Sequence, residues 1–75
     1  NVFSNIVISV DNVQNFVVVK TLSGSGSAAA ESIDSMNFDG IAGTIAGDNT
    51  IFILTINENK AEEIVKKLKK MLENK

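Results

Sequence analysis

Two short runs, residues 16–19 and 51–54, are rich in β-forming side chains and apolar at every position. A strand with one face in water would alternate apolar and polar residues, so these runs predict strands that are covered on both faces. In a chain of 75 residues, two helices can shield one face of a four-stranded sheet. We therefore expect neighbouring copies of the chain to bury the other face or an edge, as in an obligate oligomer. The alternative is that both strands are simply core.

An amphipathic pattern that begins at Lys60 predicts a C-terminal helix. Its apolar positions recur at intervals of three and four residues and are Ala61, Ile64, Val65, Leu68, Met71 and Leu72. Asn57 or Asn59 can cap its start, and early acids with late lysines suit the helix dipole. Its polar side carries Lys66, Lys67, Lys69 and Lys70. Because Glu62 and Glu63 lie close by, we expect these lysines to form a solvated face and not a DNA contact.

The remaining segments predict four strands and one more helix. We expect strands at 6–10, 16–21, 41–46 and 50–56, with a loop at 11–15 and a turn at 47–49. The Ser/Gly run at 23–27 offers caps for a helix at 28–36, in which Ala29, Ile33 and Met36 share a face. The order ββαββα predicts an α+β fold, a four-stranded antiparallel sheet with two helices packed on one face, in one domain over 1–75.

Composition excludes several kinds of chemistry. The chain has no Cys and no His, so disulfides, thiol nucleophiles, imidazole bases and structural zinc sites built on them are ruled out. We expect no enzyme, no metal and no cofactor. An enzyme that uses Asp34 and Asp48 as a catalytic carboxylate pair is the least favoured alternative, because no nucleophile accompanies them. The net charge of −2 predicts that this segment alone does not bind DNA. The apolar runs are too short to span a bilayer, so we expect a cytoplasmic protein without membrane contact.

Three stretches carry residue types that bind ligands. The Ser/Gly run at 23–27 offers backbone N–H groups for an anion at a helix start, although a plain loop and cap explains it equally well. Asp34 is an acid inside the predicted helix, next to the apolar Ile33, and such an acid is usually solvated. In residues 43–50, glycines flank a short strand and Asp48 lies at a hairpin tip, where a turn-forming role is the ordinary interpretation.

Taken together, these stretches resemble the C-terminal domain of bacterial arginine repressors. Residues 43–50, Gly-Thr-Ile-Ala-Gly-Asp-Asn-Thr, match the family hallmark Gly-Thr-Ile-Ala(or Cys)-Gly-Asp-Asp-Thr with one substitution, and residues 20–24 and 34–36 precede it at the family's spacing. The resemblance covers about residues 6–72. It implies trimers, two of which stack into a hexamer with L-arginine between them, and a separate N-terminal winged helix-turn-helix domain that binds operator DNA. That domain is absent from this chain, so we expect a longer protein.

The resemblance implies ligand contacts for individual residues. Asp48 matches the acceptor of the arginine guanidinium across the boundary between trimers, a pairing that is among the strongest charge-assisted contacts. Asp34 matches the acid that holds the ligand's α-amino group, and Thr44 and Ala46 match positions whose backbone lines the pocket. Ser27 matches a position that is usually Gln or His, so its contact is direct, water-mediated or lost.

Asn49 stands where the family has the second Asp of its pair. The loss of one negative charge per site weakens the attraction for a cationic ligand. It also makes the ligand-free hexamer easier to assemble, because fewer like charges meet at the interface. The resemblance implies an L-arginine-sensing, hexamerising domain of a transcription regulator of arginine metabolism. Asn49 and Ser27 motivate the alternative, a structural oligomerisation module of a paralogue with weakened or lost sensing. An amino-acid-binding domain of another α+β family would differ by lacking stacked trimers.

Overall fold

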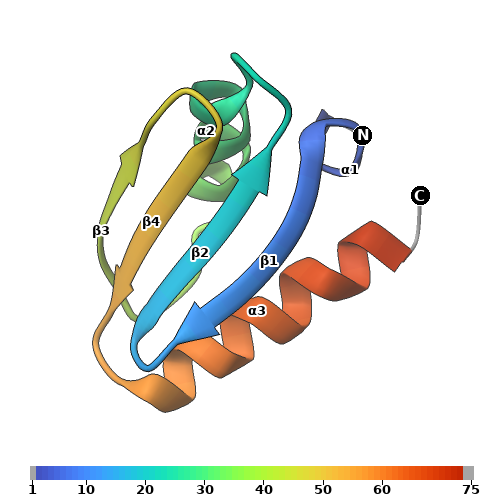
Figure 1. The fold of residues 1–75 in the computed structure, drawn as a ribbon. Coiled ribbons are helices and arrows are strands. Elements are labelled where there is room, and N and C mark those ends of the chain that lie inside the picture. Colours follow the sequence, from blue (N-terminus) through green and yellow to red (C-terminus); the bar gives the residue numbers. More distant parts are fainter. Residues whose placement is uncertain (1, 74–75) are drawn as a thin grey trace.

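The computed structural model describes residues 2–73, in which helices cover one face of a sheet (Figure 1). In chain order the elements are α1 (Val2–Ile6), β1 (Val7–Val13), β2 (Phe16–Thr21), α2 (Gly26–Ser35), β3 (Ile41–Ala46), β4 (Thr50–Thr55) and α3 (Glu58–Glu73). Residue 1 and residues 74–75 of the predicted domain lie outside the described range. The predicted α+β class and the four-stranded antiparallel sheet are confirmed.

The strand order is β1-β2-β4-β3, so the two apolar runs lie side by side at the centre of the sheet. Their register pairs Val17 with Ile53 and Val19 with Ile51, and all four side chains are buried. The edge strands are β1 and β3, which are the less uniformly apolar ones. The position of the strands therefore follows their hydrophobicity, because a central strand has no free edge in water.

The core lies between the sheet and the helices. Ala29, Ala30 and Ile33 of α2 pack on one part of the buried sheet face, and α3 packs beside them. The predicted apolar stripe of α3 is confirmed, since Ala61, Ile64, Val65 and Leu68 are buried and Met71 and Leu72 are partly buried. Its lysines 66, 67, 69 and 70 are exposed.

Several predicted boundaries are wrong. The 11–15 loop shrinks to a turn at Gln14 and Asn15, because β1 runs on to Val13 opposite Phe16 and Gln14 takes a φ of 53°. The first strand begins one residue later than predicted, since residues 2–6 form α1, which was not predicted at all. Phe3 anchors α1 with a fully buried ring. A helix this short has too few residues to establish a period, so only its tertiary packing holds it.

The two longer helices also start earlier than predicted. The helix α2 begins at Gly26 and ends at Ser35, against the predicted 28–36, and α3 begins at Glu58. Asn57 caps α3, because its Oδ1 accepts the Lys60 N–H at 2.8 Å. The last strand ends at Thr55, whose hydroxyl lies 2.8 Å from the Asn57 carbonyl. Of the two predicted caps, Asn57 is confirmed and Asn59 lies within the helix.

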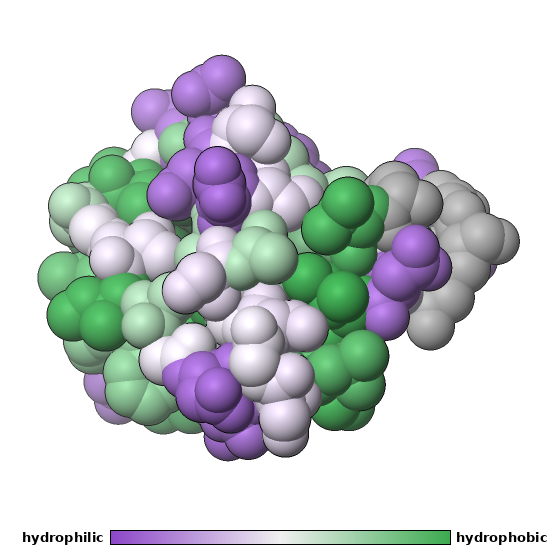
Figure 2. Space-filling model, turned by 90° about the horizontal axis from the view of Figure 1, so that it is seen from above, coloured by the Kyte–Doolittle hydropathy of each residue, from purple (hydrophilic) through white to green (hydrophobic). Residues whose placement is uncertain are grey.

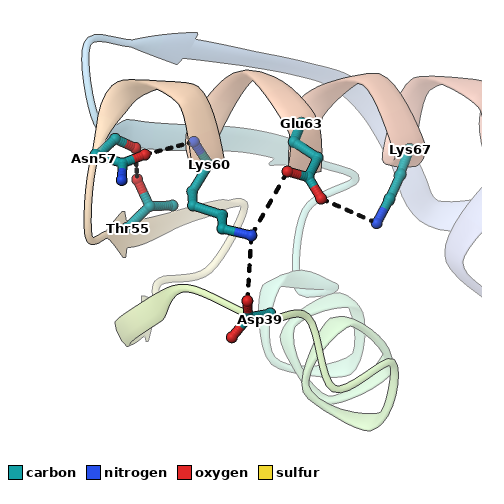
Figure 3. Close-up of polar contacts among 6 residues, drawn as sticks. All are labelled: Asp39, Thr55, Asn57, Lys60, Glu63 and Lys67. Atoms are coloured by element: carbon teal, nitrogen blue, oxygen red, sulfur yellow. Dashed lines mark hydrogen bonds and ion pairs between the residues drawn. The ribbon is translucent and has the colours of Figure 1, made fainter.

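Lys60 ties α3 to the connection between α2 and β3 (Figure 3). Its Nζ lies 3.2 Å from Asp39 Oδ2 and 3.7 Å from Glu63 Oε2. The hydrogen bond to Asp39, with the nearby Glu63 charge, raises the pKa of Lys60. Gly40 lies beneath the stem of this lysine with a φ of 88°, and a Cβ there would come within 2.8 Å of Lys60 Cγ. A side chain at residue 40 would therefore be strained by the positive φ and would displace the Lys60 stem, so glycine is strongly favoured here.

The other face of the sheet is apolar and uncovered, and we call it the open face. It is formed by Phe16 and Val18 of β2, Phe52 and Leu54 of β4, and Ile45 of β3. The rings of Phe16 and Phe52 meet edge to face, with centroids 6.5 Å apart, and line a shallow hollow with Val18. Seen from above, hydrophobic side chains gather on two sides of the molecule, with a more polar band between them (Figure 2). The apolar character predicted for both faces is thus confirmed.

Candidate functional site

The turn between β3 and β4, which carries Asp48, is docked on the first residue of α2. The Gly26 N–H donates to the Asp48 carbonyl at 2.9 Å. A Cβ at residue 26 would collide with the Gly47 carbonyl oxygen, so no other residue type permits this approach. Sequence reasoning missed this role of Gly26; its only signal was the glycine within the Ser/Gly run at 23–27. The contact brings together two predicted segments, and the bonded residues Gly26 and Asp48 are 22 residues apart in the chain.

Backbone hydrogen bonds also hold the turn from the side of the sheet. The Thr21 N–H at the end of β2 donates to the Asn49 carbonyl at 2.8 Å, and the Gly47 N–H donates to the Thr50 carbonyl at 2.7 Å. The main chain of the turn is therefore fixed by α2, by β2 and by its own closing bond. These hydrogen bonds fix the point at which the Asp48 side chain leaves the main chain.

Ser27 and Asp34 lie on one flank of α2. They are seven residues apart, about two helical turns, and the buried Ala30 lies between them. The opposite flank, with Ser32 and Ser35, lines a hollow against α1. Ser27 and Asp34 therefore face away from α1, on the side where α2 contacts β3. Asp34 lies roughly 10 Å further along the helix axis than Ser27.

Thr44 and Ala46 of β3 complete this edge of the molecule. Thr44 pairs with Ile53 and Ala46 with Ile51, so both belong to the helix-covered face of an edge strand. Thr44 is half-buried and Ala46 is exposed. Five of the six predicted residues thus gather along α2, β3 and the turn that joins β3 to β4. We call Ser27, Asp34, Thr44, Ala46 and Asp48 the β3-edge site.

Asn49 is held apart from the other five residues. Its Oδ1 accepts a hydrogen bond from the Thr50 hydroxyl at 3.1 Å. Thr50 lies on the open-face side of β4, because Ile51 after it is buried and Phe52 is exposed. The Asn49 side chain therefore turns toward the open face, whereas Asp34 and Ser27 lie on the helix side of the sheet.

The β3-edge site is negatively charged and chemically simple. Asp34 and Asp48 are exposed, and within residues 2–73 neither carboxylate has a hydrogen-bond or ion-pair partner. Free carboxylates of this kind attract a cationic group that offers N–H donors. Among the described residues no group of acidic, His or Cys side chains is arranged to hold a metal ion. The same range contains no helix with the length and apolarity that crossing a bilayer requires.

The comparisons with known proteins agree on one family. The family described as the arginine repressor C-terminal domain matches residues 3–70. A protein named arginine repressor from Clostridium novyi is 97% identical over the whole chain, which covers 50% of that relative. A protein of the same name from Clostridium tetani is 67% identical over 96% of the chain and 47% of its own length. The corresponding protein from Clostridium acetobutylicum is 65% identical over 95% of the chain. The chain spans about half the length of these curated relatives.

Proposed function

The chain belongs to the arginine repressor family, as its C-terminal domain, and from this premise we propose that it senses L-arginine and forms the oligomer of an arginine-dependent transcription regulator. The family consists of transcription regulators and not of enzymes. The regulated processes in this proposal are those of arginine metabolism, and the regulator acts in the cytoplasm. L-arginine is then an effector and not a cofactor.

One observation carries the proposal: the unpaired Asp48 carboxylate stands on a turn that is locked against the start of α2. A guanidinium group is a planar fork of N–H donors, and an ionised carboxylate accepts two of them in parallel. The rigid turn means that little conformational entropy is lost when this pair forms. Asp48 is therefore proposed as the acceptor for the guanidinium of L-arginine.

The β3-edge site is best understood as half of a ligand site. Its residues lie on an exposed edge, and a second copy facing this edge would exclude water from Asp48 and Asp34 together. Asp34 is proposed to hold the α-amino group, while Ser27 and the backbones of Thr44 and Ala46 line the space between. Burial at an interface strengthens each charge-assisted contact, because the local dielectric constant falls.

The open face supports the assembly part of the proposal. Phe52 is 52% exposed and Ile45 is 77% exposed on a sheet that is otherwise paired and packed. Contiguous apolar surface of this kind marks a protein–protein contact. We propose that copies meet through this face to form a trimer, and that two trimers stack through the β3-edge site with L-arginine between them.

Operator DNA is proposed to bind through a winged helix-turn-helix domain N-terminal to this chain. The chain covers about half of its relatives, which leaves room for such a domain. Hexamerisation would gather several DNA-binding domains, so that weak individual contacts add through effective concentration. Linkage then requires that arginine favours the hexamer and that the hexamer favours arginine to the same degree.

Two residues favour a second candidate function, a structural oligomerisation module with weakened or lost arginine sensing. Asn49 carries no charge, and its Oδ1 is already bonded to Thr50. Ser27 is exposed and its hydroxyl reaches only a short distance from the helix. Asn49 lacks the charge that the family hallmark would supply to a cationic ligand, and Ser27 reaches less far than the Gln or His that is usual at its position.

Sedimentation equilibrium at several protein concentrations, with and without millimolar L-arginine, tests the proposal. We expect a shift from trimer toward hexamer when arginine is added. A hexamer that ignores arginine would favour the structural module instead. A chain that stays monomeric under all conditions would contradict both functions.

A further inference from the structure

The two edges of the sheet differ in how they are protected. An edge strand presents main-chain N–H and C=O groups that pair readily with a further strand, so proteins shield such edges with charges, bulges or covering elements. Here the edge strands are β1 and β3, and within residues 2–73 no other strand pairs with the outer side of either one. A comparison of the two edges therefore shows which of them is available for pairing.

The outer edge of β1 is shielded by an ion pair. Asp11 is the register partner of Val18, so its side chain lies on the open-face side of the sheet. Lys69 belongs to α3 on the opposite side, and its Nζ nevertheless lies 3.2 Å from Asp11 Oδ1. The contact between these two side chains therefore spans the outer edge of β1. A bulge between Val7 and Ser9 also interrupts the beginning of this strand.

The outer edge of β3 has no comparable shield. None of the six residues of Ile41–Ala46 is charged, and four of them are exposed. The bulge of this strand lies between Ile41 and Gly43, so Gly43–Ala46 stays in regular register with β4. Figure 1 shows β3 at the border of the sheet, with no helix beyond it. This stretch is therefore the edge that can accept another strand.

We propose that β3 of a second copy pairs antiparallel along this edge, so that the two sheets become one continuous sheet. The inference rests on the proposed function, because it concerns how the two trimers stack. The two-fold axis of such a pair is perpendicular to the sheet. Both open faces then lie on one side and both α2 helices on the other, so each open face stays free to contact neighbours within its own trimer. Pairing of this kind is a common mode of strand recognition.

The pairing explains why the β3-edge site lies where it does. Antiparallel strands run in opposite directions, so the Asp48 turn that follows β3 in one copy lies beside the beginning of β3 in the other. Thr44 and Ala46 belong to the helix-covered face of β3, and α2 contacts this strand. The paired strands therefore form a floor between the two α2 helices, and the second copy brings its Asp48 to that space.

The pairing is too short to hold two trimers together alone. Gly43–Ala46 offers four residues in each copy, and each main-chain hydrogen bond that they form adds little net free energy. The exposed carboxylates of Asp34 and Asp48 oppose the approach of a second copy until a cation lies between them. The edge therefore pairs when the ligand is bound.

Cysteine cross-linking tests the pairing, because the chain has no cysteine of its own. Facing residues of antiparallel strands have Cα atoms about 4.5–5.5 Å apart, which a disulfide can span. Thr44→Cys and Ala46→Cys, singly and as an equimolar mixture, should form covalent dimers with oxidised glutathione when L-arginine is present. Asn12→Cys on β1 is the matched control, because it also lies on an edge strand, and it should form none. Together the three samples cover every register centred between residues 44 and 46.

Hydrogen exchange followed by NMR gives a test in the parent chain that does not depend on register. The alternate amides of β3 that face away from β4 should exchange about tenfold or more slowly in the hexamer than in the trimer, while the amides of β1 stay unchanged. An arginine-dependent hexamer without this protection would overturn the pairing and leave the proposed function standing. Protection already present in the trimer would assign the edge to the first step of assembly and also overturn the pairing.

Two outcomes separate the pairing from arginine sensing. Cross-linking and protection in a hexamer that ignores arginine would support the pairing and contradict the sensing function. A chain that forms no hexamer, gives no cross-link and shows no protection of β3 would overturn both.

Discussion

Replacing Phe52 with alanine measures what the open face contributes to assembly. A phenylalanine side chain buries about 200 Å² when fully covered. Phe52 is 52% exposed in a single chain, so about 100 Å² remains for a neighbouring copy to cover. At about 25 cal/mol per Å², covering it contributes about 2.5 kcal/mol per copy, of which alanine would retain a small part.

The effect multiplies in a symmetric assembly. Losing about 2 kcal/mol from each of three copies reduces the trimer association constant by about four orders of magnitude. The midpoint concentration of a monomer–trimer equilibrium varies as the inverse square root of the association constant, so it should rise by about a hundredfold. A change of this size is far outside the error of a dilution series.

Sedimentation equilibrium over a dilution series is the assay for Phe52→Ala. Val2→Ala serves as the matched control, because Val2 is 60% exposed but belongs to α1, away from the open face. Its midpoint should stay within about threefold of the parent chain. Circular dichroism of both variants would establish that the sheet persists. Equal midpoints for the two variants would refute the assignment of the open face as the trimer contact.

Three further predictions address the site and its support. Asp48→Asn should lower the affinity for L-arginine by about ten- to a hundredfold in calorimetry, at an unchanged melting temperature, because the side chain has no partner within residues 2–73. Gly26→Ala should destabilise the chain by about 1–2 kcal/mol in urea, because the collision with the Gly47 carbonyl outweighs the better helix propensity of alanine. Lys60→Met should lower stability slightly at neutral pH. Since the bond to Asp39 raises the lysine pKa, that difference should vanish once the pH rises through the raised value.

The sequence predicted the elements whose side chains repeat with a clear period. The stripe of α3 from Ala61 to Leu68 matches the buried set, and the runs around Val17 and Ile53 are the central strands. The prediction failed for α1, where five residues carry less than two turns of pattern. It also failed for Asp11, which was predicted to lie in a loop but belongs to β1. A polar residue on an edge strand looks like a loop residue in the sequence, and here it pairs with Lys69. Edge strands and short helices depend on tertiary contacts that no local pattern records.

The features of the candidate site also differ in whether a local sequence pattern reveals them. The motif at residues 43–50 was visible in the sequence because its residues are contiguous, and the ligand contact that it predicts for Asp48 stays a prediction. The docking of Gly26 on Gly47 was not identifiable, because it joins segments far apart in the chain through a missing side chain. The orientation of Asn49 was equally hidden, since it depends on a lysine and a threonine from two paired strands. Contacts of this kind follow from the sheet register and not from composition.

The placement of the two proposed contact surfaces suggests an order of assembly. The open face lies on one side of the sheet, whereas Asp34 and Ser27 lie on its helix-covered side. Apolar burial at the open face involves no charged group of the β3-edge site, so the trimer should form with or without ligand. Bringing two β3-edge sites together places exposed carboxylates near each other, which costs free energy until a cation lies between them. On this proposal a cationic ligand is expected to act on the second step. Raising the salt concentration should then promote hexamers of the ligand-free chain while leaving the trimer midpoint nearly unchanged.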